Sequence, residues 1–104
     1  MSPALLNIDM SELAELCKRW GISEISMFGS MARHAAGPDS DVDLVVTLPP
    51  DAHWSLLDHQ RVKLELERMT GRRVDLLTRR AIEHSHNALR RREILSTLKV
   101  LYAA

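Results

Sequence analysis

The sequence has few of the residues that form disulfides or stack on bases: among its 104 residues are one cysteine, one phenylalanine, one tyrosine and two tryptophans. One cysteine forms no internal disulfide, so we expect a reduced, cytoplasmic protein. So few aromatic side chains offer no stacking platform for single-stranded nucleic acid. The formal net charge is +0, whereas a dedicated nucleic-acid binder needs a basic excess to neutralise phosphates. Direct nucleic-acid binding is therefore disfavoured.

Long apolar runs, repeats and low-complexity linkers are also missing. No stretch reaches the roughly 18 apolar residues of a membrane span, so we expect no membrane association. The start, "MSPALLNIDM", has neither the charged beginning nor the continuous apolar run of a signal peptide. The length predicts one compact domain over residues 1–104. Because such a domain has a thin core, we expect large parts of any active site to come from a partner chain.

Charge is unevenly distributed along the chain. From Arg72 onward there are eight Lys or Arg residues against three Asp or Glu residues, and the earlier part is acidic by the same margin. This asymmetry has two interpretations: an anionic ligand or partner near the C-terminal third, or a solvated basic helix.

Hydrophobic periodicity predicts a small α/β domain with a short mixed sheet packed with helices. The first helix has one apolar stripe at helical spacing, made of Leu13, Leu16, Cys17 and Trp20. The expected helices cover 9–21, 54–69 and 80–98, the last in one or two pieces, with a brief helical turn over 30–36. The expected strands cover 22–28, 41–48 and 72–78.

Two aspartates lie on the strongest predicted strand. Successive strand residues point to opposite faces, so Asp41 and Asp43 project together while Val42 and Leu44 fill the core. Two carboxylates so close repel each other unless a cation neutralises them. Mg²⁺ is the ion that proteins usually bind with carboxylate oxygens beside phosphates. We therefore predict that this pair holds magnesium.

A third carboxylate fits the same site. Val74 and Leu76 form the apolar face of the last predicted strand, so Asp75 points away from it. If this strand lies beside the first pair, three carboxylates converge and are enough for two Mg²⁺ ions. Asp75 is also placed to accept the proton of an acceptor hydroxyl.

The residues ahead of the aspartates are typical of a phosphate site. Gly29 allows close backbone approach to a ligand, and a helix opening at Ser30 directs free N–H groups at an anion. Arg33, one turn later, adds positive charge or braces the loop. A phosphate cradle beside metal-binding carboxylates indicates transfer at a nucleoside triphosphate.

The segment "GSMARHAAGPDSDVDLVV" resembles the signature of the minimal nucleotidyltransferases of the DNA polymerase β-like superfamily. "GRRVDLLT" is similar to the strand of that family's third carboxylate, and "EILSTLKVLY" to its usual ending. The resemblance covers nearly the whole chain. It departs at one position, because the family usually has glycine where this chain has His34.

The resemblance implies an antitoxin, the MNT half of a HEPN/MNT toxin–antitoxin module. Such proteins transfer AMP from ATP to a tyrosine of a HEPN-domain ribonuclease toxin and silence it. By matching positions, Asp41 and Asp43 would hold Mg²⁺, and Asp75 would complete the metal site and help activate the tyrosine hydroxyl. The nucleotide-binding positions implied by the match are Gly29, Ser30, Arg33 and Ser40.

Two other functions remain open at this stage. One is a non-catalytic antitoxin that blocks the toxin by contact. Its neutralisation of the toxin would persist without the three aspartates. The other is nucleotidyl transfer to a small molecule, although such enzymes carry an additional acceptor domain. A zinc site is disfavoured, because His84 and His86 are separated by one residue and face different sides of a helix.

Overall fold

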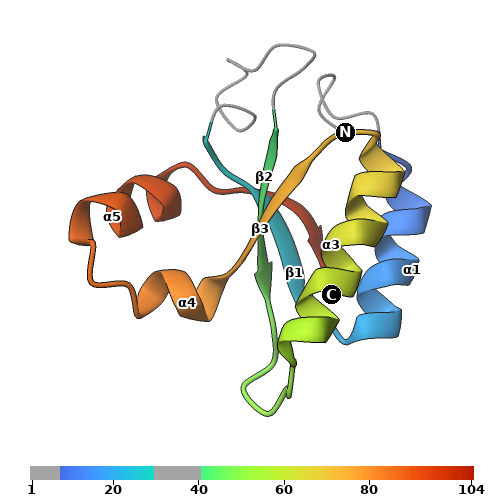
Figure 1. Ribbon diagram of the computed structural model, residues 1–104, viewed down its shortest axis with the longest axis horizontal. Coiled ribbons are helices and arrows are strands. Elements are labelled where there is room, and N and C mark those ends of the chain that lie inside the picture. The colour runs from blue at the N-terminus through green and yellow to red at the C-terminus, as the bar shows by residue number, and fades with distance from the viewer. Residues whose placement is uncertain (1–7, 30–40) are drawn as a thin grey trace.

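The computed structural model describes residues 8–29 and 41–104, so the expected helical turn over 30–36 lies outside the described residues. Within these residues, four strands and four helices follow one another (Figure 1). They are α1 (Met10–Trp20), β1 (Glu24–Met27), β2 (Val42–Thr47), α3 (Leu56–Thr70), β3 (Val74–Thr78), α4 (Arg79–Glu83), α5 (Ala88–Ser96) and β4 (Lys99–Ala103).

The strands form one mixed sheet in the order β3-β2-β1-β4. β1 is antiparallel to both β2 and β4, whereas β2 and β3 are parallel. The parallel pair places the two aspartate-bearing strands side by side. The predicted α/β class with a short mixed sheet is confirmed.

Helices α1 and α3 lie side by side over one face of the sheet (Figure 1). The apolar residues of β2 that alternate toward this face, Val42, Leu44 and Val46, belong to the main core together with α1 and α3. The predicted stripe of α1 is confirmed, since Leu13, Leu16 and Cys17 are completely buried and Trp20 packs against them. Most of the buried apolar surface of the described chain is on this side.

Helices α4 and α5 lie on the other side of the sheet (Figure 1). A smaller cluster joins Phe28 and Val45 of the sheet region to Ile82 of α4 and Ile94 of α5. Val45 alternates with the main-core residues of β2, so Asp43, two residues earlier, shares its face. This face therefore carries both a small core and the carboxylates.

Helix ends are fixed by local hydrogen bonds. Asp9 accepts from the backbone N–H of Ser11 and Glu12, which confirms it as the N-cap of α1. The helix expected over 54–69 begins later, at Leu56, because Ser55 and Asp58 form a capping box that sets the first turn. The prediction was wrong there by two residues, and Trp54 lies before the helix.

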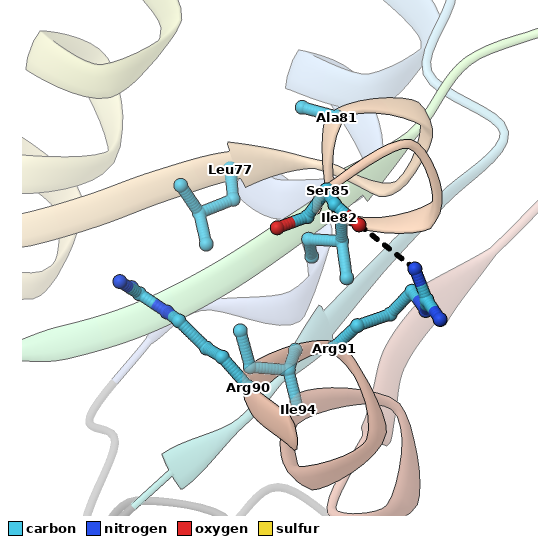
Figure 2. A pocket seen from close by; sticks show the side chains of 7 residues that line it. All are labelled: Leu77, Ala81, Ile82, Ser85, Arg90, Arg91 and Ile94. Carbon is cyan, nitrogen blue, oxygen red and sulfur yellow. Dashed lines mark hydrogen bonds between the residues drawn. The ribbon is translucent and has the colours of Figure 1, made fainter. Parts of the chain in front are cut away.

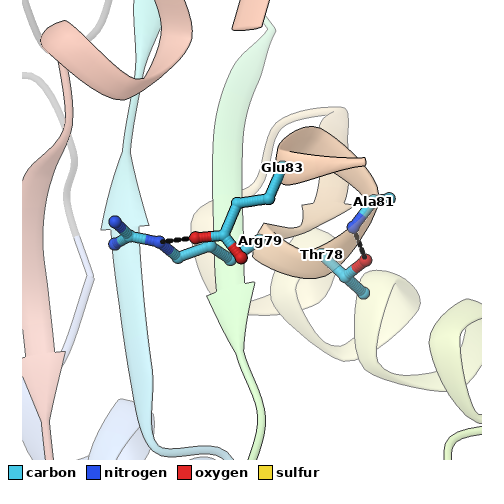
Figure 3. A network of polar contacts seen from close by, with 4 residues as sticks. All are labelled: Thr78, Arg79, Ala81 and Glu83. Carbon is cyan, nitrogen blue, oxygen red and sulfur yellow. Dashed lines mark hydrogen bonds and ion pairs between the residues drawn. The ribbon is translucent and has the colours of Figure 1, made fainter. Parts of the chain in front are cut away.

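The segment expected to be helical over 80–98 is two helices. Thr78 accepts from the N–H of Ala81 to cap α4, and the Arg79–Glu83 ion pair of 3.2 Å spans that helix (Figure 3). Asn87 accepts from the N–H of Arg90 and begins α5.

The last strand was not predicted. β4 pairs with β1 at the edge of the sheet, with Tyr102 opposite Ile25. Its apolar run is too short to distinguish a strand from other structure by pattern alone. Among the described helices, none is both long and apolar enough to cross a membrane.

Candidate functional site

The site centres on Asp43 at the start of β2, beside the end of β1. The N–H of Phe28 donates to the carbonyl oxygen of Asp43 over 3.0 Å, which brings Gly29 against the aspartate. Gly29 has φ +69°, and a Cβ atom built on it would lie 2.8 Å from Asp43 Oδ2. Only glycine therefore fits here without displacing the carboxylate, because both the backbone angle and the space exclude a side chain.

Asp75 is the direct cross-strand neighbour of Asp43. In the parallel register of β2 and β3, Asp43 is paired with Asp75 and Leu44 with Leu76. Paired residues on adjacent strands point to the same face of the sheet, so the two carboxyl groups share the α4–α5 side. The structure thus meets the condition set in the sequence analysis, that the strand of Asp75 lies beside the strand of Asp43.

Asp41 lies one residue before β2 and is exposed, as is Asp75, whereas Asp43 is half-buried. The N–H of Val42 donates to the carbonyl oxygen of Arg73 over 2.8 Å and ties this end of β2 to the start of β3. The three aspartates are therefore held by two neighbouring strand ends.

Electrostatics single out Asp43. Its pKa is raised above the usual 3.8, first by burial and then by the negative charges of Asp75 and Asp41, while the Arg90 guanidinium acts in the opposite direction. Burial and like charge both disfavour the ionised carboxylate. A bound cation would relieve the repulsion that the neighbouring aspartates impose.

The donor chemistry of the three aspartates suits magnesium, which prefers carboxylate oxygens. In residues 8–29 and 41–104, no three His, Cys, Asp or Glu side chains form a group arranged to hold a metal ion. The mutual repulsion at Asp43 and the glycine cradle against its Oδ2 are the features that fit a cation here. Magnesium binding by these residues stays a prediction.

Four residues of the sequence motif cannot be placed. Ser30, Arg33 and Ser40, predicted to bind nucleotide, lie outside the described residues, as does His34. Gly29 is the one predicted nucleotide-binding position that lies among the described residues, and it lies directly against Asp43.

Arg90 was not singled out by the sequence prediction, although its charge acts on Asp43. It lies on α5, 47 positions after Asp43 in the numbering, and no local motif connects the two. The only signal was the basic excess after Arg72, which left a choice between an anion site and a solvated helix. Arg90 lines the hollow that begins at Gly29, so part of this basic excess lies at the predicted site.

Two neighbouring hollows open on the α5 side of the site. One, of about 270 Å³, is lined by Gly29 and Phe28 together with Arg90, Glu93, Ile94 and Thr97 of the α5 region. The other, of about 180 Å³, lies between α4 and α5 and shares Arg90 and Ile94 with the first. A larger hollow of about 760 Å³ lies near Thr47 and Thr78, where β2 and β3 end, whereas the aspartates lie where these strands begin. None of the predicted site residues lines this hollow. Size alone therefore does not locate the chemistry.

The sequence matches known proteins along most of its length. The profile of the nucleotidyltransferase domain family matches residues 11–101. A candidate protein adenylyltransferase of Methanocaldococcus jannaschii is 38% identical over 81 residues, which are 78% of this chain and 82% of the relative. The protein adenylyltransferase MntA of Thermococcus cleftensis is 39% identical over 69 residues, covering 66% of this chain and 68% of the relative.

Solved structures resemble the fold. A candidate minimal nucleotidyltransferase, 34% identical, superposes with a TM-score of 0.65 over 89% of this chain and 87% of its own. A toxin–antitoxin structure with AMP-PNP gives a TM-score of 0.70 at 16% identity, over 93% and 75% of the two chains. A complex of a tri-AMPylated Shewanella oneidensis HEPN toxin with its MNT antitoxin gives 0.61 at 15% identity, over 91% and 70%. At such low identity the last two likenesses show the fold alone.

Proposed function

The chain belongs to the nucleotidyltransferase domain family, and we propose that it is an antitoxin of the protein adenylyltransferase type. Residues 1–104 act as one minimal nucleotidyltransferase domain that transfers AMP from ATP to a tyrosine of a HEPN-domain toxin. The relative MntA is named a protein adenylyltransferase, and one structure of the same fold contains AMP-PNP. Another of the same fold is a complex with an AMPylated HEPN toxin. These relatives support both the nucleotide and the class of partner.

One observation carries the proposal: Asp43 lies in register with Asp75 and against Gly29. Two carboxylates repel each other on adjacent strands, and the space beside Gly29 admits no side chain. This arrangement has no evident structural purpose. The glycine permits a phosphate to approach the carboxylates closely. A pure binding protein would not need to keep this repulsion.

The reaction is a displacement at the α-phosphorus of ATP. The tyrosine oxygen of the partner forms a new bond to this phosphorus, and the bond from the phosphorus to the oxygen that bridges to the β-phosphate breaks. Pyrophosphate leaves with the electron pair of that bond. Asp75, exposed on β3, accepts the proton of the tyrosine hydroxyl as a general base.

Asp41, Asp43 and Asp75 would hold magnesium, which would supply positive charge to the phosphates when bound. Gly29 keeps Asp43 accessible by leaving no Cβ against its Oδ2. Ser30, Arg33 and Ser40 complete the nucleotide-binding set in this proposal, through backbone N–H groups, hydroxyls and a positive charge. The chain's own residues thus orient the phosphates and remove a proton.

The decisive experiment measures the mass of the partner. The purified chain, ATP, Mg²⁺ and a HEPN-domain toxin are incubated, and intact-mass spectrometry follows the toxin. The wild-type chain should add one or more AMP units, and Asp43→Ala should add none. Asp51→Ala, which removes an exposed carboxyl between β2 and α3, is the matched control and should act as wild type does.

Two results would overturn the proposal. Equal modification by the wild-type and Asp43→Ala chains would remove the aspartate from the chemistry. Neutralisation of the toxin by a triple variant lacking Asp41, Asp43 and Asp75, with no mass change in any sample, would instead establish a non-catalytic binding antitoxin.

A further inference from the structure

We propose that the nucleotide binds at Arg90 and in the pocket between α4 and α5. Arg90 contacts the phosphates, and the pocket holds the base. This inference rests on the proposed function, which makes ATP the substrate. It adds two features to the site that lie outside the Gly29-to-Asp43 motif: a cation on α5 and a pocket for the nucleobase.

The position of Arg90 supports a phosphate contact. It lines the hollow that begins at Gly29, and its positive charge reaches the Asp43 carboxyl. Within the described part of the chain its guanidinium makes no hydrogen bond or ion pair, whereas Arg79 pairs with Glu83 and Arg91 donates to the Ser85 carbonyl oxygen. Of these three arginines on α4 and α5, Arg90 keeps its donors available for a ligand, and the planar guanidinium matches phosphate oxygens.

A negative side chain makes this cation more important. Glu93, one turn after Arg90 on α5, lines the same hollow. Its carboxylate repels an anion placed there, since like charges raise the energy of a shared site. A phosphate chain in this hollow therefore depends on Arg90, and loss of that charge should weaken binding strongly.

The pocket between α4 and α5 suits a flat, largely apolar group. Four of its seven lining side chains are aliphatic, and Arg90 and Arg91 extend on opposite sides of it (Figure 2). The lining residues are Leu77, Ala81, Ile82, Ser85, Arg90, Arg91 and Ile94. A guanidinium attracts the face of an aromatic ring, and aliphatic groups shield it from water. A nucleobase has this combination of properties.

The sizes of the two hollows fit a divided ligand. The pocket between α4 and α5 has a volume of about 180 Å³, below the roughly 300–1,000 Å³ of sites that enclose a whole small-molecule ligand. The hollow at Gly29 holds about 270 Å³, and Arg90 lies in the walls of both. A nucleotide that crosses Arg90 would place phosphates on the Gly29 side and its base on the α4 side.

The test of Arg90 compares two ligands with the full chain in Mg²⁺: a non-hydrolysable ATP analogue and inorganic triphosphate. Arg90→Gln should raise the Kd of both by roughly tenfold or more, as expected for a lost charge-assisted contact. Arg92→Gln is the matched control, because Arg92 is exposed on the same helix and lines neither hollow. It should change either Kd by less than about twofold.

The test of the base pocket uses a substitution that fills it. Ala81 is exposed on α4 and lines the pocket, so Ala81→Leu should raise the Kd of the ATP analogue and leave that of inorganic triphosphate unchanged. Ala88→Leu, at an exposed position of α5 outside both hollows, is the control. Thermal melting of each variant checks that the fold is retained.

The outcomes separate the two proposals. If the wild-type chain binds neither ligand, the proposed function fails and this inference fails with it. If the wild type binds the analogue and Arg90→Gln binds it equally well, only the role of Arg90 is overturned. If Ala81→Leu weakens both ligands equally, or neither, the base does not occupy the pocket.

Discussion

The two faces of the sheet differ in what they bury. The α1–α3 face holds a continuous core of completely buried residues such as Leu16, Val46 and Leu66. Among the described residues, the apolar cluster of the α4–α5 face has four buried members. Beside it lie a half-buried Asp43, an exposed Asp75 and an exposed Arg90. One sheet thus separates stability from chemistry, since a charged site can be tolerated where the opposite face provides most of the apolar burial.

The largest expected effect separates the faces by activity. Asp75→Asn removes the proposed proton acceptor from the α4–α5 face and should lower AMP transfer by about 10²–10⁴-fold, the usual range for general-base loss. Its melting temperature should stay close to that of the wild type, because the side chain is exposed. A quantitative transfer assay with labelled ATP measures it, with Asp51→Asn as control. Full activity of Asp75→Asn would assign the base elsewhere.

The opposite variant lies in the α1–α3 core. Leu66 is completely buried on α3, so Leu66→Ala should destabilise the fold by about 2–5 kcal/mol through lost burial and a cavity. Urea unfolding measures this change. Transfer by the folded fraction at low temperature should stay near the wild-type rate. If activity per folded molecule collapses as well, the two faces are not separable.

Two glycine substitutions compare the faces with a smaller expected loss of stability. Gly29→Ala and Gly21→Ala both force alanine to φ +69°, but only the Cβ at Gly29 meets the Asp43 carboxylate. Each variant should lose about 1–2 kcal/mol of stability from the left-handed backbone, measured by urea unfolding. Only Gly29→Ala should also lose transfer activity. Equal activity of the two variants would show that the close approach to Asp43 is not used.

The smallest expected effect is a pH dependence that belongs to the α4–α5 face. Burial and the neighbouring aspartates raise the pKa of Asp43 in the folded chain above its usual 3.8. An acid with a raised folded pKa is stabilising when protonated and loses that contribution as the pH rises through the two pKa values. Without divalent cations, Asp43→Asn should therefore gain stability relative to the wild type as the pH rises above the usual value of 3.8.

Thermal melting of both chains across this range measures the difference. Mg²⁺ should then raise the melting temperature of the wild type more than that of Asp43→Asn, because a ligand stabilises only a state that binds it. A pH-independent difference would contradict the electrostatic account of Asp43. An equal Mg²⁺ response would remove this carboxylate from the proposed metal site.

Patterns that are local in sequence predicted most of the fold. The apolar stripe of α1, the alternation of β2 and the buried face of α3 each repeat within a few residues, so periodicity was sufficient. The start of α3 was misplaced because a capping box competes with a continuing apolar pattern. β4 was missed because its five residues become a strand only by pairing with β1, more than seventy positions earlier in the numbering.

The sequence predicted only part of the site. Asp41 and Asp43 are two residues apart on one predicted strand, so their shared direction follows from strand geometry. The match of Asp75 to Asp43 needed the parallel register of β2 and β3, which only the structure supplied. Arg90 was beyond prediction, because its closeness to Asp43 depends on how α5 folds back over the sheet.

The amino-acid sequence by itself determined which residues face the core and which carboxylates could share a face, because alternation and helical periodicity are properties of the local chain. The tertiary structure alone decided that Gly29 lies against Asp43, where an added Cβ would be 2.8 Å from Oδ2. It also decided that the charge of Arg90 acts on the Asp43 carboxyl. Such contacts join residues far apart along the chain, and strand register and helix packing, rather than local pattern, bring them together.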